Sequence, residues 1–280
     1  MEIRGSLRKE VTMKNSEQLN QFLEHYQQYA AEVLKPTVDE LNRLFEGWNI
    51  RLERDHPELS RLATPSPLRI TQARIKRPES VVDKILRKPD QFPEGLTINS
   101  VSRMKDAVAG RVVVYFLSGI HLIDGEIHNS EMLEISEEYA PVANFSDAVS
   151  NGLRLNNVHK DDLGESIMSP SSMIYTVRFQ TDYLPKEKRP WFELEVRTLT
   201  EHLWKDVQHV LGYKPFKRTS FAVSTHFEII EAQLDSLDEH FNLLFEELLR
   251  FQETATFHDS DILNAENLPA VLTELGIGCA

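Results

Sequence analysis

The sequence of 280 residues contains a single cysteine and no long apolar run. That residue, Cys279, is next to last in the chain, which excludes an intrachain disulfide and a cysteine-based zinc site. No segment approaches the roughly 20 apolar residues that span a bilayer, and residues 1–18 lack the apolar core of a signal peptide. These absences predict a cytoplasmic protein with no membrane partner.

Basic residues are also scarce, with 31 Lys and Arg against 44 Asp and Glu and a formal net charge of −13. A protein that binds duplex DNA presents a broad basic face to the phosphates, so this balance argues against a duplex DNA partner. The hydrophobic share of 41% and the charged share of 27% are ordinary for a globular protein. We therefore expect one large domain or a domain with appendages.

Both ends of the chain have helical patterns. Apolar residues recur at steps of three and four over residues 16–34 and 37–48, and Pro36 between them predicts a break. We expect a helical N-terminal extension over residues 1–68. A similar apolar stripe over residues 227–249 predicts a long helix in a C-terminal part, residues 221–280. We expect this helix to pack onto the domain, and the alternative is a partner helix in a homo-oligomer.

The middle of the chain, residues 69–220, mixes strand-like and helix-like segments. Alternating polarity or β-branched residues predict strands at 69–77, 108–116, 172–180 and 191–197. Helices are predicted at 79–88 and 199–213, and the polar residues 140–171 predict a long functional loop. This order predicts an α/β (α+β) fold, with a mixed central sheet flanked by helices.

Polar residues gather on one face of the predicted strand 191–197. Because side chains alternate along a strand, Glu193, Glu195 and Arg197 share a face. Charged groups in an otherwise apolar strand are costly unless they are paired or used. A solvated face with a cross-strand salt link remains the alternative to a functional site.

Residues 69–88 form a basic segment in this acidic chain, with seven Lys and Arg against two Asp and Glu. Arg74 and Lys76 would point the same way from a strand, and Ser80 and Lys84 lie one turn apart on the next helix. Such local basicity favours a polyphosphate site, although a solvated charged helix gives the same pattern.

An aspartate precedes the most apolar predicted strand. Asp106 stands two residues before this strand, and Arg111 follows five residues later. A carboxylate at the lip of a core strand is a natural Mg²⁺ ligand facing phosphates. A turn or capping aspartate has the same appearance.

Together these segments resemble the RelA/SpoT synthetase domain. The matching motifs read RIKRPESVVDK from Arg74, DAVAGRVVVYF from Asp106 and ELEVRTLTEHLWKDVQHVLGYK from Glu193, and the resemblance covers about residues 69–250. The last motif is the most specific. Its matching residues are Glu193, Arg197, Thr198, His202, Trp204, His209, Tyr213 and Lys214.

The resemblance implies a nucleotidyltransferase-like fold and transfer of pyrophosphate from ATP to the 3′-hydroxyl of a nucleotide. Asp106 and Glu193 would hold Mg²⁺, and Glu193 would also orient or deprotonate the attacking hydroxyl. The residues implied to bind ATP are Arg74, Lys76, Ser80, Lys84, Arg111 and Arg197. The residues implied to bind the acceptor are Ser172, His202 and Lys214. Positioning and charge neutralisation carry most of the catalysis in such a transfer.

The sequence departs from the family in the acceptor half. The family reads Gly-Tyr-x-Ser-x-His in its acceptor loop, whereas residues 169–174 read SPSSMI and keep only Ser172. Pro170 replaces the tyrosine that stacks on guanine, and such stacking is worth roughly 1–3 kcal/mol per base. Glu195 stands where the family has glutamine, and Ala109 where it has glycine.

Three functions are compatible with these departures. The acceptor could be a molecule other than free GDP or GTP, and the tRNA 3′ end used by toxin-type relatives is a precedent. The chain could be an ordinary (p)ppGpp synthetase in which residues 156–171 supply another stacking group. It could also be a catalytically inactive sensor or scaffold. Residues 1–68 lack the His-Asp pair of the family's hydrolase domain, so we expect no alarmone hydrolase activity.

Overall fold

The computed structural model describes residues 17–56, 67–138, 141–144, 171–211 and 221–254. It divides into two units, Met1–Glu239 and His240–Ala280. The sheet and the polar residues singled out above lie in the first unit. The domain boundaries expected after residues 68 and 220 stay predictions. Among the described residues, no helix is both long enough and apolar enough to cross a membrane.

A continuous helix, with no break at Pro36, forms the N-terminal layer. Helical residues 17–29 run into a π-helical turn, Ala30–Leu34, and then into α2, Lys35–Asp55. The predicted break was wrong because the π turn accommodates a proline that an ordinary α-helical turn would exclude. The amide of Lys35 bonds to the carbonyl of Ala30, five residues back. The hydroxyl of Thr37 donates to the Val33 carbonyl at 2.8 Å.

The central part contains the predicted strands and further elements that the sequence pattern did not reveal. Strands β1, β2, β5 and β6 and helices α3 and α7 confirm the predicted segments, whereas α4, α5, β3 and β4 were missed. The elements are β1 Leu68–Ile75, α3 Pro78–Arg87, α4 Ile98–Ser102, β2 Val108–Val114, α5 Leu117–His128, β3 Leu133–Ile135, β4 Val142–Asn144, β5 Ser172–Phe179, β6 Phe192–Thr198, α7 Leu199–Val210 and α8 Phe221–Thr254. Most of the predicted loop 140–171 lies outside the described residues.

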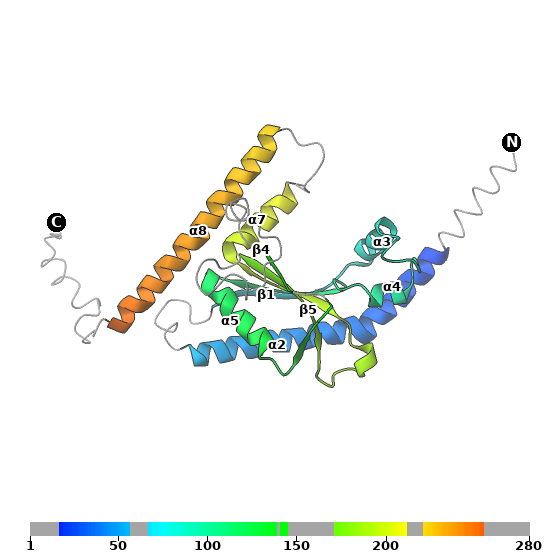
Figure 1. Ribbon diagram of the computed structural model, residues 1–280. Helices are drawn as coiled ribbons and strands as arrows, with labels where there is room; N and C mark the ends of the chain where they lie inside the picture. The colour runs from blue at the N-terminus through cyan, green and yellow to red at the C-terminus, as the bar shows by residue number, and fades with distance from the viewer. Residues whose placement is uncertain (1–16, 57–66, 139–140, 145–170, 212–220, 255–280) are drawn as a thin grey trace, which may run out of the picture. The chain divides into compact units, whose positions relative to one another are not determined.

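The six strands form one mixed sheet in the order β1-β2-β6-β5-β3, with β4 also pairing with β5. Strands β2 and β6 are parallel, and the other pairs are antiparallel. Figure 1 shows α2 and α5 on one side of this sheet and α7 on the other. The predicted α+β class with a mixed central sheet is confirmed.

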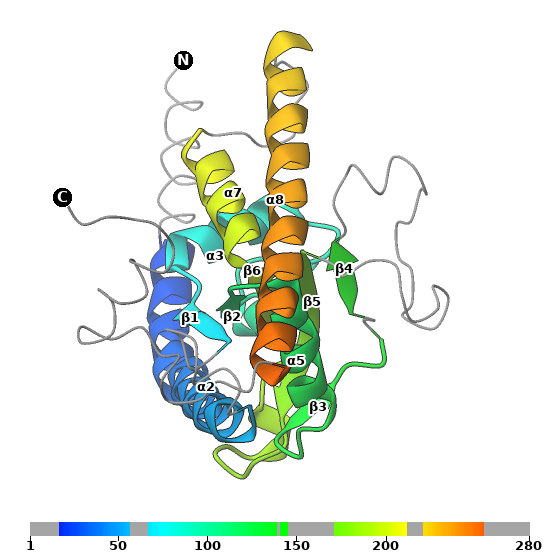
Figure 2. The same cartoon turned by 90° about the vertical axis from the view of Figure 1, so that its left-hand side faces the viewer.

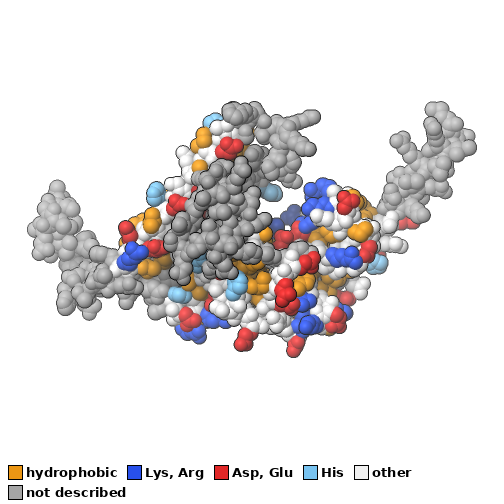
Figure 3. Space-filling model, viewed as in Figure 1, with side chains coloured by type: hydrophobic (Ala, Val, Ile, Leu, Met, Phe, Trp, Pro, Cys, Tyr) orange, Lys and Arg blue, Asp and Glu red, His pale blue; other side chains and the backbone are white. Residues whose placement is uncertain are grey.

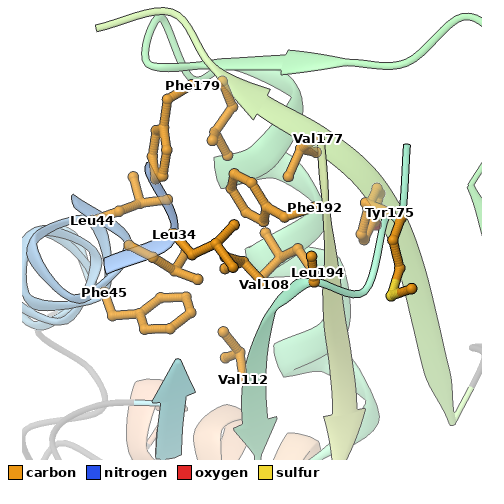
Figure 4. Packing of buried hydrophobic residues seen from close by; sticks show 14 of the residues in the cluster. Leu34, Leu44, Phe45, Val108, Val112, Tyr175, Val177, Phe179, Phe192 and Leu194 are labelled. Carbon is orange, nitrogen blue, oxygen red and sulfur yellow. The ribbon is translucent and has the colours of Figure 1, made fainter. Parts of the chain in front are cut away.

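The apolar core lies between the sheet and the helices α2 and α5. Figure 4 shows Leu44 and Phe45 from α2 pointing toward Val112 and Leu194 of the sheet. The strands β2 and β6 contribute every second side chain to this core. The side chains between these core residues point to the opposite face of the sheet. On that face β2 and β6 carry several charged residues.

Gly110 is a point of close approach between β2 and α2. A Cβ atom at this position would lie 2.8 Å from Leu41 Cδ2 and 2.9 Å from Leu194 Cδ1, and both leucines are fully buried. We expect Gly110→Ala to lower the free energy of unfolding by about 1–3 kcal/mol, because the packed side chains cannot move away. Urea unfolding measures this change.

The matched control for that substitution is Gly47→Ala in α2. Gly47 is exposed, and no atom lies within 4 Å of the position of its added Cβ. This change should raise helix stability by up to about 1 kcal/mol, since alanine is the better helix former. Equal effects of the two substitutions would show that Gly110 is not a packing constraint.

Helix α8 packs against α7 through part of the predicted face, at Phe227, and through polar side chains beside it. The rings of Phe227 and Trp204 lie 5.5 Å apart, and Trp204 Nε1 donates to Glu231 at 3.1 Å. Figure 2 shows α7 beside the first part of α8. Ile230 and Leu237 of the predicted stripe are 42% and 41% exposed, so the expectation that they pack onto the domain was wrong. The sequence pattern missed that polar side chains occupy part of the packed face.

Candidate active site

The polar face of the sheet carries the predicted site residues in rows. Strand register places residues opposite each other on the same face in neighbouring strands. The first row contains Arg74, Ala109, Glu193 and Thr176. The second row contains Gln72, Arg111, Glu195 and Ile174, and the third contains Ile70, Val113, Arg197 and Ser172.

Asp106 links two lysines at one end of this face. Lys76 Nζ and Lys84 Nζ each lie 2.6 Å from a different carboxylate oxygen of Asp106. All three side chains are largely buried. Burial by itself would raise the pKa of Asp106, but the hydrogen bonds from both lysines outweigh it and lower that pKa. The carboxylate is therefore ionised, and it neutralises part of the positive charge of the lysines.

Glu193 lies beside this cluster. Its backbone N–H donates to the carbonyl of Lys105 at 3.0 Å, which fixes β6 next to the segment that carries Asp106. Burial raises the pKa of Glu193, and the negative charge of Asp106 raises it further. The two carboxylates therefore interact unfavourably, as expected where a cation is to bind between them.

These donors fit a magnesium ion that also binds nucleotide phosphates. Mg²⁺ prefers oxygen ligands and is usually held by one or two carboxylates together with substrate phosphates. Asp106 and Glu193 supply two such carboxylates. Among the described residues, no group of three His, Cys, Asp or Glu side chains that could hold a metal ion gathers in one place.

A second polar cluster occupies the next two rows. Arg111 Nε lies 3.0 Å from Glu195 Oε2, and Arg197 Nη1 lies 3.6 Å from Glu195 Oε1. Arg197 Nη2 lies 2.7 Å from His202 Nδ1. Burial and the neighbouring Arg197 both lower the pKa of His202, so this imidazole is neutral at pH 7 and its Nδ1 can accept the hydrogen bond.

The remaining predicted site residues in the described part of the chain belong to neither of the two polar clusters. Arg74 and Ser80 are exposed, and Ser80 lies within the first turn of α3 rather than at its cap. Ser172 is fully buried beside Arg197. Lys214 lies outside the described residues. Their roles in binding ATP or the acceptor stay predictions.

Two further residues were missed by the sequence analysis. Lys105 has a lowered pKa, chiefly because of burial, and it interacts electrostatically with Glu193. Asp238 on α8 hydrogen-bonds to Thr198 at the end of β6. The sequence offered one signal for each residue. Lys105 is a basic residue next to Asp106, and Asp238 is an acidic residue four positions after Leu234, on the same helical face.

Basic side chains gather over the end of the sheet that carries α3. Figure 3 shows blue Lys and Arg side chains there, with acidic side chains among them. The predicted basic segment 69–88 contributes two lysines, Lys76 and Lys84, to the cluster around Asp106. A concentration of positive charge next to Glu193 is suited to holding a polyphosphate.

Comparison with known proteins identifies the family. Residues 73–218, just over half of the chain, match the family described as the region found in RelA / SpoT proteins. The chain therefore belongs to the RelA/SpoT family.

A curated relative is GTP pyrophosphokinase YjbM of Bacillus subtilis (strain 168). It is 24% identical over 200 residues, which are 71% of this chain and 75% of the relative. Solved structures show the same fold. Small alarmone synthetase 1 of Bacillus subtilis bound to its product pppGpp aligns with a TM-score of 0.56 and 17% identity, covering 80% of this chain and 98% of that one.

A second solved structure is a GTP pyrophosphokinase family protein from Streptococcus pneumoniae. It has a TM-score of 0.53 and 19% identity, and the alignment covers 78% of this chain and 94% of that one. At these identities the solved structures support the fold. The assignment of substrates to this chain has to come from its own site.

Proposed function

We propose that this chain is a pyrophosphokinase that transfers pyrophosphate from ATP to the 3′-hydroxyl of a guanosine nucleotide. The observation that carries the proposal is the cluster of Lys76, Lys84 and Asp106 beside Glu193. It combines phosphate-binding cations, metal-binding carboxylates and a general base in one place. Family membership and the name of the curated relative support the same reaction.

In this reaction the 3′-oxygen of the acceptor attacks the β-phosphorus of ATP. The new O–Pβ bond forms as the bond between Pβ and the oxygen bridging to Pα breaks, and AMP leaves with that oxygen. Glu193 accepts the proton of the attacking hydroxyl. The raised pKa of Glu193 makes its carboxylate a stronger base than an ordinary glutamate.

The side chains of the cluster would divide the charge of the triphosphate. When bound by Asp106 and Glu193, Mg²⁺ would supply further charge neutralisation for the transferred group. Lys76 and Lys84 would then move from Asp106 to the phosphate oxygens. Arg74, at the exposed edge of the first row, is free to contact the adenine.

An acceptor other than a free guanosine nucleotide, such as the tRNA 3′ end, is the second candidate. Ile174 takes the position of the family histidine and lies opposite Glu195 on the polar face. The acceptor half therefore has an apolar side chain and a carboxylate where the family has two polar side chains. This difference supports an altered acceptor, whereas Arg74, Lys76, Ser80 and Lys84 match the family motif.

We also propose that the protein forms a homo-oligomer through the helix over residues 227–249. Exposed apolar side chains on α7 and on the first part of α8 support it. They include Leu203, Val210, Leu211, Ile229, Ile230 and Leu237. A second copy of the chain would cover such a surface.

A label-transfer assay tests the proposed reaction and identifies the acceptor. The protein is incubated with Mg²⁺ and ATP labelled in the γ-phosphate, and GDP, GTP, ATP and bulk tRNA are offered separately. We expect label in a guanosine nucleotide, and label in tRNA would establish the second acceptor. If ATP binds but no acceptor becomes labelled, the proposal is wrong and the chain is a sensor or scaffold.

A further inference from the structure

Strand β6 runs into helix α7 without a connecting loop. Thr198 is the last residue of β6 and Leu199 is the first of α7. The hydroxyl of Thr198 accepts a hydrogen bond from the Glu201 amide at 3.1 Å, which caps the helix. The same residue therefore ends the strand that carries Glu193 and begins the helix that carries His202.

Asp238, which lies far along the chain on α8, holds this junction. Thr198 Oγ1 donates to Asp238 Oδ2 at 2.5 Å. Asp238 is 3% exposed, and Thr198 is fully buried. A buried carboxylate without partners is costly, and burial does raise the pKa of Asp238, whereas hydrogen bonds from Thr198 and Thr200 act against this.

One hydroxyl group thus connects two elements. A threonine hydroxyl has one proton to donate, and here the proton points to Asp238. The orientation of that O–H bond directs an oxygen lone pair toward the Glu201 amide. Without Asp238 the hydroxyl can rotate, and the first turn of α7 loses a fixed cap.

The first turn of α7 in turn positions the second polar cluster. His202 lies in this turn and contacts Arg197 at 2.7 Å. Arg197 is 2% exposed and also faces Glu195, which holds Arg111. A chain of contacts therefore connects α8 with the row of side chains next to Glu193.

We propose that Asp238 is a positioning residue, which orients His202 and Arg197 through the Thr198 cap and so sets the geometry of the second polar cluster. The proposal rests on the proposed function for its kinetic consequence. The structural link itself does not depend on which acceptor is used. Asp238 touches no reacting group, and its effect passes through Thr198.

The kinetic test is a double-mutant cycle with Asp238→Ala, which removes the acceptor of the Thr198 hydroxyl, and Thr198→Val. A displacement of about 1 Å in a positioned group can cost about a hundred-fold in rate, and we expect each variant to lose about ten-fold in kcat. The KM for ATP should change less than kcat, because the Lys76–Asp106–Lys84 cluster does not depend on the Thr198–Asp238 contact. Because both variants break the same link, the double variant should lose no more than either single one.

The matched control is Glu239→Gln, which removes one carboxylate at the exposed neighbouring position. Thr198→Ser keeps the hydroxyl and should restore nearly wild-type kcat. Thermal unfolding provides the folded fraction of each variant, so that rates are compared per folded molecule. The proposal would be overturned if the losses of kcat disappear once rates are compared per folded molecule. It would also be overturned if the loss in the double variant equals the combined losses of the two single variants.

A second readout does not depend on activity. The imidazole resonances of His202, assigned with His202→Asn, report the environment of this ring by NMR. We expect these resonances to shift in Asp238→Ala and in Thr198→Val, but not in Glu239→Gln. Unshifted His202 resonances in folded Asp238→Ala protein would overturn the proposal. If the protein transfers no label at all, the resonances still decide whether the link exists.

Discussion

Glu193→Gln should reduce pyrophosphate transfer by about a thousand-fold, the middle of the range for loss of a general base. Glutamine has nearly the same size and shape, but it cannot accept the proton of the attacking hydroxyl. It also removes one of the two carboxylates available to Mg²⁺. Lys76 and Lys84, the lysines proposed to contact the triphosphate, remain, so ATP affinity should change much less than kcat.

The matched control is Glu195→Gln, the same substitution two residues along the same strand face. Glutamine is the family residue at this position, so transfer should continue. Steady-state label transfer gives kcat, and isothermal titration calorimetry gives the ATP affinity. Glu193→Gln protein with wild-type kcat would remove Glu193 from the mechanism.

Asp106→Asn is expected to change catalysis and metal-free nucleotide binding in opposite directions. Transfer should fall by about a hundred-fold or more, because the substitution removes a carboxylate that we propose as a ligand of Mg²⁺. In the presence of a chelator, however, ATP should bind more tightly than to the wild type. Lys76 and Lys84 are held by Asp106 at 2.6 Å each, and asparagine would release both for the phosphates.

Calorimetric titration of ATP with EDTA, and separately with Mg²⁺, measures both effects. Asp83→Asn is the control, because Asp83 is an exposed carboxylate on α3 that pairs with Arg87 one turn away. It should alter neither quantity. Weaker metal-free binding by Asp106→Asn would show that the two lysines do not depend on Asp106 as the geometry requires.

The grouping of Lys76 and Lys84 could be expected from sequence because its signals are local. Lys76 directly follows β1 and Lys84 lies in α3, the next helix. The face shared by Glu193, Glu195 and Arg197 follows from the alternation of a single strand. The resemblance to the RelA/SpoT family then connected these segments.

The contacts between residues far apart in the sequence, which hold the site together, could not be predicted from local patterns. Arg111 and Glu195 are 84 residues apart, and Thr198 and Asp238 are 40 apart, so no periodicity relates them. Helix α5 was missed because its pattern of apolar residues contains two glycines and few charges. The break expected at Pro36 failed because a π-helical turn is not specified by any local residue pattern.

The position of β6 determines when the site forms during folding. This strand is among the last in the chain, yet it lies between β2 and β5 and is parallel to β2. Pairing strands that are so distant in sequence requires the closure of a long loop, which slows folding. The N-terminal helix and the β1–β2 pair can form earlier, but without β6 they carry neither Glu193 nor its neighbours. An incompletely folded chain, newly synthesised or recovering from denaturation, would therefore hold phosphate-binding lysines without being able to consume ATP.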